Sequence, residues 1–336
     1  MLARVAENVY WLARYLERAE NTARLVSVNT NLLLDLPAGC TPGWQPLIDI
    51  TGSRETFDSR GGRADERSIV QFLIADPDNP GSIASSLKMA SENGRSLRDV
   101  LPTATWELLN QFFQQFTDQL PTALSKRTRF NFLKGIVLTS QMLTGAIEGT
   151  MNRNDAYTFL MLGRNLERAD MTSRIADVRS AQLPPAETLE LRPFDTIQWM
   201  SVLKSLSGYQ MYWLSRRTRI SRADVLGFVL RDEQFPRACL FCLKQIERCL
   251  RALPHSAKVL DTLAVVCGFL SDVELGALEQ IVLHDIIDLL QLHINGVHAG
   301  IAQTYFPAPT GATTMLQLQR LDTSQQLQVL ADVASN

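Results

Sequence analysis

Apolar and small residues recur at helical spacing along almost the whole chain. In residues 1–36, for example, Leu12, Leu16, Ala19 and Ala23 fall on one side of a helix drawn at about 100° per residue. The same spacing predicts further helices over 44–51, 68–74, 82–99, 104–118, 126–152, 155–182, 194–206, 209–219, 221–230, 235–253, 256–269, 272–283 and 284–306. No segment has the strict alternation of a half-buried strand or an Asn-Gly hairpin turn. We therefore predict an all-α fold.

Clusters of proline, glycine and polar residues separate these helices and end the folded part of the chain. They occur at 37–39, 76–81 and 183–185, and residues 53–66 form a polar loop. After residue 306 the chain is rich in Thr, Gln, Ala and Ser, which is typical of a weakly ordered tail over 307–336. We predict one helical domain over 1–306.

One phrase occurs twice, in residues 12–25 and again in residues 162–175, at a distance of 150 positions. The matched positions are Leu12 and Leu162, Arg14 and Arg164, Leu16 and Leu166, Glu17 and Glu167, Arg18 and Arg168, Ala19 and Ala169, Thr22 and Thr172, and Arg24 and Arg174. A long-period match of this kind predicts an internal repeat. We therefore expect two loosely repeated halves, 1–152 and 153–306, in a bundle-like array around the two signature helices.

The charged positions of each copy lie opposite its apolar stripe. A solvated helix face laced with local ion pairs has this pattern, and each such pair contributes only a few tenths of a kcal/mol. The alternative is a partly buried ionic cluster, because both copies keep Arg, Glu, Arg and Arg in the same slots while Tyr15 and Asn165 differ. A purely structural network also remains open, since buried charges must be paired whatever their purpose.

Composition narrows the class of protein. A hydrophobic content of 46% and a charged content of 20% are typical of a globular chain, and a net charge of −2 provides no basic field for nucleic acid. No apolar run approaches the roughly 20 residues of a membrane span, and the first residues do not have the pattern of a signal peptide. With five cysteines, an odd number, we expect free thiols and a cytoplasmic location.

Motifs for known chemistry are absent from the sequence. There is no phosphate-binding loop, dinucleotide fingerprint, zinc-protease motif or nucleophile elbow. Cys239 and Cys242 spell C-x-x-C, but they lie within an apolar helical pattern and are interpreted as core thiols. His284 and Asp288 share a helix face, whereas His293 lies opposite. We expect no metal and no cofactor.

Two further clusters of charged residues are candidate binding sites. Arg216, Arg217, Arg219 and Arg222 follow an aromatic run that begins at Tyr209, and Arg with aromatic neighbours suits phosphate or carboxylate. The same residues also suit a solvated helix end. The ambiguity is the same for the set Glu92, Asn93, Arg95 and Arg98, which precedes Trp106.

These residues together resemble the alpha-E domain family, an all-helical family with a Glu-Arg signature. The resemblance is carried by the two copies around Glu17-Arg18 and Glu167-Arg168, by Ser-Leu-Ser-Gly-Tyr at 205–209, and by Phe-Pro-Arg at 235–237 with Glu-Arg at 247–248. It spans residues 1–306. In the first copy Ala13 replaces the glycine found at 163, so the close approach that glycine permits is expected in one half only.

The resemblance implies a bacterial setting with a circularly permuted ATP-grasp protein and a transglutaminase-like peptidase as partners. Such a set is similar to a system that forms and cleaves amide bonds. We expect this chain to be its accessory or binding component, without stand-alone activity. The alternative is an enzyme in which Glu17 or Glu167 is the general acid or base.

The signature therefore yields three structural expectations. The two signature helices should pack together. Their polar faces should form one partly buried cluster. That cluster should bind an acidic peptide or a phosphate-bearing ligand through Arg14, Glu17, Arg18, Arg24, Arg164, Glu167, Arg168 and Arg174. The secondary candidates are Tyr209, Arg216, Arg217 and Arg219.

Overall fold

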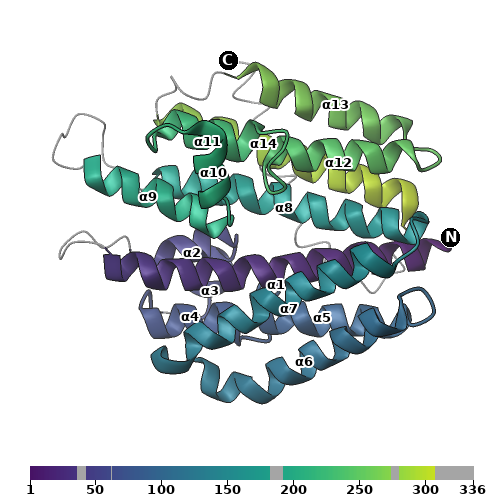
Figure 1. The fold of residues 1–336 in the computed structure, drawn as a ribbon, viewed down its shortest axis with the longest axis horizontal. Helices are drawn as coiled ribbons and strands as arrows, with labels where there is room; N and C mark the ends of the chain where they lie inside the picture. Colours follow the sequence, from purple (N-terminus) through teal and green to yellow (C-terminus); the bar gives the residue numbers. More distant parts are fainter. Residues whose placement is uncertain (36–42, 62, 182–191, 274–279, 307–336) are drawn as a thin grey trace.

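Two long helices, α1 (Ala3–Asp35) and α8 (Asp155–Ala181), run side by side through the middle of the molecule (Figure 1). The computed structural model describes residues 1–35, 43–61, 63–181, 192–273 and 280–306. Cys40 and the predicted tail 307–336 lie outside these ranges. The two helices carry the two copies of the repeated phrase, so the prediction that they pack together is confirmed.

The remaining elements are also helices, and no strand occurs in the described ranges. They are α2 (Gln45–Ile50), α3 (Arg54–Asp58), α4 (Glu66–Ile74), α5 (Ile83–Ser96), α6 (Thr103–Ala123), α7 (Lys126–Thr150), α9 (Arg192–Ser205), α10 (Tyr209–Arg216), α11 (Arg222–Arg231), α12 (Cys239–Arg251), α13 (Ala257–Asp272) and α14 (Gln280–Tyr305). The all-α prediction is confirmed. None of the described helices is apolar over a length that could cross a bilayer.

The helices pack in the same order around α1 and around α8. Helices α5 and α7 lie against α1 and are joined by α6, while α12 and α14 lie against α8 and are joined by α13. The short helices cross over, because α2 packs on α8 and α9 packs on α1 as well as α8 (Figure 1). Two half-repeats would pack in this way, and their boundary near residue 152 stays a prediction.

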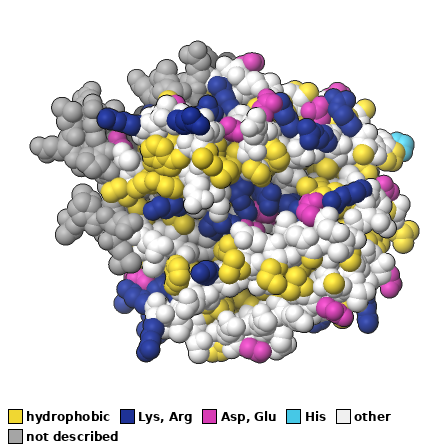
Figure 2. Space-filling view, viewed as in Figure 1, with side chains coloured by type: hydrophobic (Ala, Val, Ile, Leu, Met, Phe, Trp, Pro, Cys, Tyr) yellow, Lys and Arg dark blue, Asp and Glu magenta, His cyan; other side chains and the backbone are white. Residues whose placement is uncertain are grey.

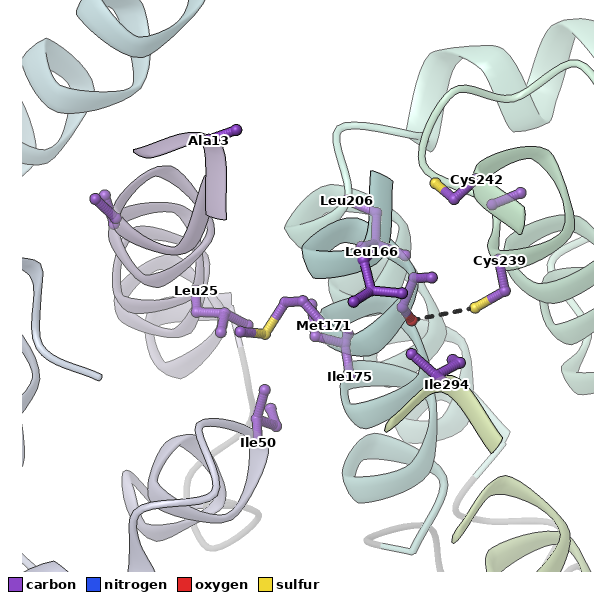
Figure 3. Close-up of a cluster of buried hydrophobic side chains, with 14 of the residues drawn as sticks. Ala13, Leu25, Ile50, Leu166, Met171, Ile175, Leu206, Cys239, Cys242 and Ile294 are labelled. Carbon is purple, nitrogen blue, oxygen red and sulfur yellow. Dashed lines mark hydrogen bonds between the residues drawn. The ribbon is translucent and has the colours of Figure 1, made fainter. Parts of the chain in front are cut away.

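The two signature helices are parallel, and their contacts advance in the same direction along both. Gly163 meets the backbone of Tyr10, where a Cβ on Gly163 would lie 2.2 Å from the Tyr10 carbonyl oxygen. One turn further on, Arg14 contacts Glu167, and beyond that Leu25 points toward Met171 (Figure 3). The expected close approach at Gly163 is therefore confirmed, and it sets how near the two polar faces lie.

Apolar side chains fill the space between the layers. In Figure 3, Leu25, Ile50, Met171 and Ile175 converge from α1, α2 and α8. Cys239 is fully buried on the other side of α8, and its thiol donates to the Ala169 carbonyl at 3.4 Å. Cys239 and Cys242 are free and buried, as the core-thiol interpretation requires.

Several helix boundaries differ from the sequence prediction. Ser82 and Ser221 cap α5 and α11 through their hydroxyls, but Thr103 caps nothing, because α6 begins at Thr103 itself after Pro102. The predicted break between residues 283 and 284 is wrong. Buried Leu283 and Ile287 continue one apolar stripe through this point, so α14 is uninterrupted from residue 280 to residue 305.

Candidate functional site

Glu167 of α8 binds two arginines of α1. Its carboxylate accepts from Arg14 Nε at 2.7 Å and from Arg18 Nε and Nη2 at 2.6 and 3.0 Å. Only 1% of Glu167 is exposed. Two charge-assisted contacts from Arg18 fix the carboxylate plane, so its orientation is determined by α1 rather than by its own helix.

Glu17 of α1 makes the reciprocal contact with α8. Its Oε2 forms an ion pair with Arg168 Nε at 2.9 Å, and its Oε1 accepts from Arg237 Nη1 at 2.6 Å. The Glu-Arg pair of each signature helix therefore reaches across to the Glu-Arg pair of the other. Side chains at i and i+1 point in different directions on one helix, which leaves each Glu free to pair with the neighbouring helix.

Arg237 belongs to the site, although the helical pattern gave no reason to include it. It lies in the turn between α11 and α12, where its carbonyl accepts from the Thr172 hydroxyl at 2.8 Å. Its guanidinium also donates to Glu20 at 2.8 Å and to the Asn21 side-chain oxygen at 2.8 Å. The available signal was the Phe-Pro-Arg segment of the family resemblance.

The outer arginines of the two copies bind at equivalent places. Arg24 pairs with Glu20 one turn earlier and donates to the hydroxyl of Ser207, which follows α9. Arg174 pairs with Asp170 at 3.1 Å and approaches Gly52, which follows α2. Each arginine therefore links its signature helix to a turn after the short helix of the other half.

The two copies differ around Arg164. Its equivalent Arg14 pairs with Glu167, but Arg164 turns to Glu148 of α7, with its Nη1 at 3.1 Å from Oε1. Glu148 also accepts from the Tyr157 hydroxyl at 2.7 Å. Glu148 is partly exposed, so this pair forms the solvent-facing edge of the cluster.

Aromatic rings cover the opposite end of the cluster. The guanidinium of Arg14 lies 5.0 Å from the ring centre of Trp11, and that of Arg18 lies 5.7 Å from the ring centre of Tyr15. Cation–π contacts of this kind stabilise arginines that are removed from water. This end is therefore better satisfied than the end that contains Arg24 and Arg237.

We call these ten residues the signature cluster: Arg14, Glu17, Arg18, Glu20, Arg24, Glu148, Arg164, Glu167, Arg168 and Arg237. Six arginines face four glutamates. Most of these side chains are buried, so the solvated-face interpretation is wrong and the partly buried cluster is confirmed. The predicted residue Arg174 lies outside it, in a local pair with Asp170.

The arginines keep both central carboxyls ionised. Burial raises the pKa of Glu167, but Arg18 and Arg14 outweigh it and lower that pKa to about 2. Burial likewise opposes ionisation of Glu17, and Arg168, Arg237 and Arg164 lower its pKa. Burial first, and then the positive charge of Arg237, lower the pKa of Arg24 to about 10, so this guanidinium is both removed from water and close to another cation.

Two buried donors at the same end have no acceptor among the described residues. They are the side-chain nitrogen Nδ2 of Asn21 and Nε of Arg24. Arg168 Nε also forms no hydrogen bond, but it lies 2.9 Å from Glu17 Oε2 in an ion pair. The Asn21 amide cannot be turned round, because its oxygen already accepts from Arg237. Buried donors are normally satisfied, so these two mark a place where an acceptor is missing.

The cluster is reached from one face of the molecule. Figure 2 shows basic and acidic side chains at the bottom of a hollow in the middle of this face, where α7 and α8 lie in Figure 1. A narrow pocket beside them is lined by Glu17, Glu20 and Arg164 together with Ser140 and Thr144 of α7. It has room for about one water molecule, so any larger ligand would lie across its mouth.

The secondary candidates lie elsewhere. Tyr209 is half-buried, Arg216 pairs with Asp232 at 3.6 Å, and Arg217 and Arg219 are exposed beyond the end of α10. Arg222 starts α11 and has two buried nitrogens without a partner. None of the four predicted residues Tyr209, Arg216, Arg217 and Arg219 contacts the signature cluster through an ion pair between described residues.

Two other predicted groups are surface features. Arg98 stacks on Trp106 at 4.8 Å from the ring centre and is exposed. His284 forms a hydrogen bond with Asp177 of α8 at 2.7 Å, and its other nitrogen lies 3.6 Å from Asp288. His284 and Asp288 are exposed, whereas Asp177 is buried. The three side chains could hold a cation, but an ordinary His–Asp contact between α14 and α8 accounts for their closeness.

Comparison with known proteins agrees with this geometry. The sequence model of the Alpha-E family, a predicted alpha-helical domain with a conserved ER motif, matches residues 1–306. The chain carries Glu-Arg at 17–18 and at 167–168, where the two signature helices pair. No solved structure shows a significant match to the chain.

Curated relatives are found in mycobacteria. Uncharacterized proteins of Mycobacterium bovis and of two strains of Mycobacterium tuberculosis are 25% identical to the chain over 276 residues. The match covers 76% of this chain and 30% of each relative. The chain therefore spans less than a third of the length of these relatives.

Proposed function

Since this chain belongs to the Alpha-E family, we propose that it is the helical, anion-binding component of a bacterial system that forms and processes amide bonds. Its partners in this proposal are a circularly permuted ATP-grasp protein and a transglutaminase-like peptidase, as the family resemblance implies. The system is cytoplasmic in this proposal, and the four free cysteines in the described part of the chain favour a reducing compartment.

One observation carries the proposal: the signature cluster holds more arginines than carboxylates and leaves buried donors unmatched. Six arginines face four glutamates, a difference of two positive charges. An unbalanced cation away from water is unfavourable unless an anion completes the group. The missing anion belongs at the Arg24 end, where cations crowd one another and Asn21 Nδ2 has no acceptor.

The ligand that fits this end is a carboxylate or a phosphate group. Arginine offers a planar pair of N–H donors to either group, and an amide nitrogen adds a third donor. An ATP-grasp system contains both kinds of group, because an acyl phosphate forms from a carboxylate before the amide bond is made. We expect an acidic peptide, or the phosphate-bearing intermediate, to be bound here.

The enzymatic alternative is less well supported by the same residues. A general acid must carry a proton near neutral pH, and the pKa of Glu167 is about 2. Arg18 and Arg14 occupy both oxygens of that carboxylate, and Glu17 is held in the same way. These side chains are better suited to hold arginines in place than to transfer protons.

The lengths of the relatives also favour an accessory role. In the mycobacterial proteins the matching segment makes up 30% of the chain, so it is joined there to a much longer polypeptide. A domain that works beside others can be linked to them covalently or can act as a separate protein. This supports a component that needs partners.

Calorimetric titration tests the binding part of the proposal. The probes are inorganic phosphate, pyrophosphate and a short peptide of glutamate residues. We expect binding by the wild type and at least tenfold weaker binding by Arg24→Lys and Arg168→Lys, because lysine keeps the charge but loses the planar pair of donors. Arg127→Lys is the matched control, since Arg127 is exposed on α7. No binding by the wild type, or equal affinity in all variants, contradicts the proposal.

An assay with the ATP-grasp partner tests the wider role. The purified chain is incubated with ATP and peptide, first alone and then with the partner, and phosphate release and amide formation are followed. We expect turnover only in the mixture. Turnover by this chain alone would favour the enzymatic alternative.

A further inference from the structure

Helix α10 exposes three large apolar side chains within four residues. Met211 is 45% exposed, Trp213 is 40% exposed and Leu214 is 68% exposed. The helix is anchored on its other side by Tyr212, which is fully buried against Phe228. Single exposed apolar residues are common on proteins, but a run of three on one short helix is typical of a contact surface.

A group of arginines follows this apolar face directly. Arg216 ends α10 and pairs with Asp232, while Arg217 and Arg219 are exposed and form no ion pair with a described carboxylate. Figure 2 shows apolar and basic side chains together on the upper part of this face, where α10 lies in Figure 1. The surface is therefore apolar at one end and cationic at the other.

The backbone holds α10 between two left-handed residues. Ser207 has a φ of 54° and Arg217 has a φ of 51°, and neither is a glycine. Arg24 of the signature cluster donates to the Ser207 hydroxyl, and a Cβ on Gly208 would lie 2.9 Å from the Phe235 ring. Ser207 and Gly208 therefore form a tight turn between α9 and α10. Strained residues persist only where the surroundings hold them, so the position of α10 is fixed on both sides.

We propose that α10 and its following arginines form a docking surface for a partner protein. The occupant is a segment that presents aspartate or glutamate beside large apolar side chains. Met211, Trp213 and Leu214 would cover the apolar side chains, and Arg217 and Arg219 would pair with the carboxylates. This surface is separate from the signature cluster and touches it only through the contact between Arg24 and Ser207 among the described residues.

Charge complementarity favours a protein segment over the other anionic occupants. Nucleic acid and anionic membranes present long arrays of charge, which are matched by extended basic faces. Here the whole chain has a net charge of −2, and Asp224 and Asp232 lie close to the arginines along the sequence. A short cationic patch beside three apolar side chains matches one amphipathic segment.

Selection from a random peptide library displayed on phage tests the proposal with the full chain as bait. The docking variant carries Met211→Gln, Leu214→Gln, Arg217→Gln and Arg219→Gln. The matched control carries Val265→Gln and Arg127→Gln, because Val265 is 61% exposed on α13 and Arg127 is exposed on α7. All the changed side chains are exposed, so both variants should unfold at the same temperature as the wild type.

We expect the wild type and the control to enrich peptides with acidic residues beside Leu, Phe or Trp. A labelled member of that set should bind the docking variant at least tenfold more weakly, and replacement of its acidic residues by amides should weaken binding as strongly. Phosphate binding by the signature cluster should be unchanged in the docking variant, which separates this test from that of the proposed function.

Three results would overturn the proposal. The first is that no peptides are enriched. The second is that the enriched peptides lack acidic residues, or that they bind the docking variant as tightly as they bind the wild type. The third is binding of a labelled single-stranded oligonucleotide, or of vesicles with 30% phosphatidylserine, that is lost in the docking variant. This last result would assign the surface to nucleic acid or to a membrane instead.

Discussion

Glu167 accepts three N–H groups from two arginines while almost none of it reaches water. Replacing it with glutamine removes the negative charge and leaves Arg14 and Arg18 buried without a counter-charge. We expect Glu167→Gln to lower the free energy of unfolding by about 3–5 kcal/mol, as for other buried pairs that lose one partner. Urea unfolding followed by circular dichroism measures this loss.

Glu247→Gln is the control for this substitution. Glu247 pairs with Arg251 on the same helix, where Arg251 is exposed and Glu247 is partly exposed, so the loss should stay below about 0.5 kcal/mol. If Glu167→Gln cost no more than the control, the ionic cluster would contribute little to folding.

The same carboxylate gives the fold an acid-sensitive component. The pKa of Glu167 falls from an ordinary 4.5 to about 2 in the folded protein, so its contribution is present above pH 4.5 and is lost as the pH falls toward 2. The contribution is on the order of 3 kcal/mol, from about 1.4 kcal/mol for each pKa unit. Melting temperatures from pH 7 to pH 2.5 should fall less steeply for Glu167→Gln than for the wild type. Parallel curves would mean that Glu167 titrates normally.

Part of the signature cluster can be read from the sequence, and part of it cannot. The repeated phrase identifies Arg14, Glu17 and Arg18 with their equivalents, because two copies that share charges in the same slots suggest a common partner. Arg237 lies 220 residues from Glu17, and no spacing rule connects a turn residue to a helix so distant in the chain. Glu148 is missed for a different reason. Arg14 pairs with Glu167, but the equivalent Arg164 pairs with Glu148 of α7, so the repeat does not indicate this partner.

At the scale of the elements, the close contact between α1 and α8 requires a glycine, without a Cβ, at residue 163. A Cβ at residue 163 would lie 2.2 Å from the Tyr10 carbonyl oxygen, and backbone cannot move aside as a flexible side chain can. We expect Gly163→Ala to separate the two helices locally and to destabilise the protein by about 2–4 kcal/mol, a range typical of overpacking and lost buried contacts. Thermal and urea unfolding measure the effect.

Gly145→Ala on α7 is the matched control. A Cβ on Gly145 would meet no atom within 4 Å, so the higher helix propensity of alanine should stabilise this variant by up to about 1 kcal/mol. Equal effects of the two substitutions would show that the approach at residue 163 is unimportant.

Helix existence was predictable because most helices bury one stripe at a spacing of three and four residues. The positions of the helix ends were less predictable. The break expected before His284 does not exist, because the sequence there contains no glycine or proline and the stripe from Leu283 to Ile287 is unbroken. The sequence of α1 could not show whether its polar face is solvated or buried. Helices cover it on several sides, so even the polar face that reads as solvated is enclosed.

At the scale of the whole molecule, many contacts join the two halves besides the chain connection at residues 152–154. α1 packs along α8, α2 packs on α8, and α9 packs on α1. Residues 152–154 are exposed, so a protease site placed there should be cut without disturbing the core. We expect the cut protein to elute from a size-exclusion column as one particle that contains both fragments. Separate elution of the fragments would mean that the connection, rather than the interface, holds the halves together.

The reciprocal contacts of Glu17 with Arg168 and of Glu167 with Arg18 have the form of an isologous dimer interface, in which residue i of one subunit meets residue j of the other and j meets i. In a true homodimer every substitution appears on both sides of the axis, so the two ends of such an interface must stay identical. A single chain is free of that constraint. Here one end has gained Arg237 and the other has gained the rings of Trp11 and Tyr15. Under the proposed function, this asymmetry lets one ionic centre remain structural while the other, which contains Arg237, binds a ligand.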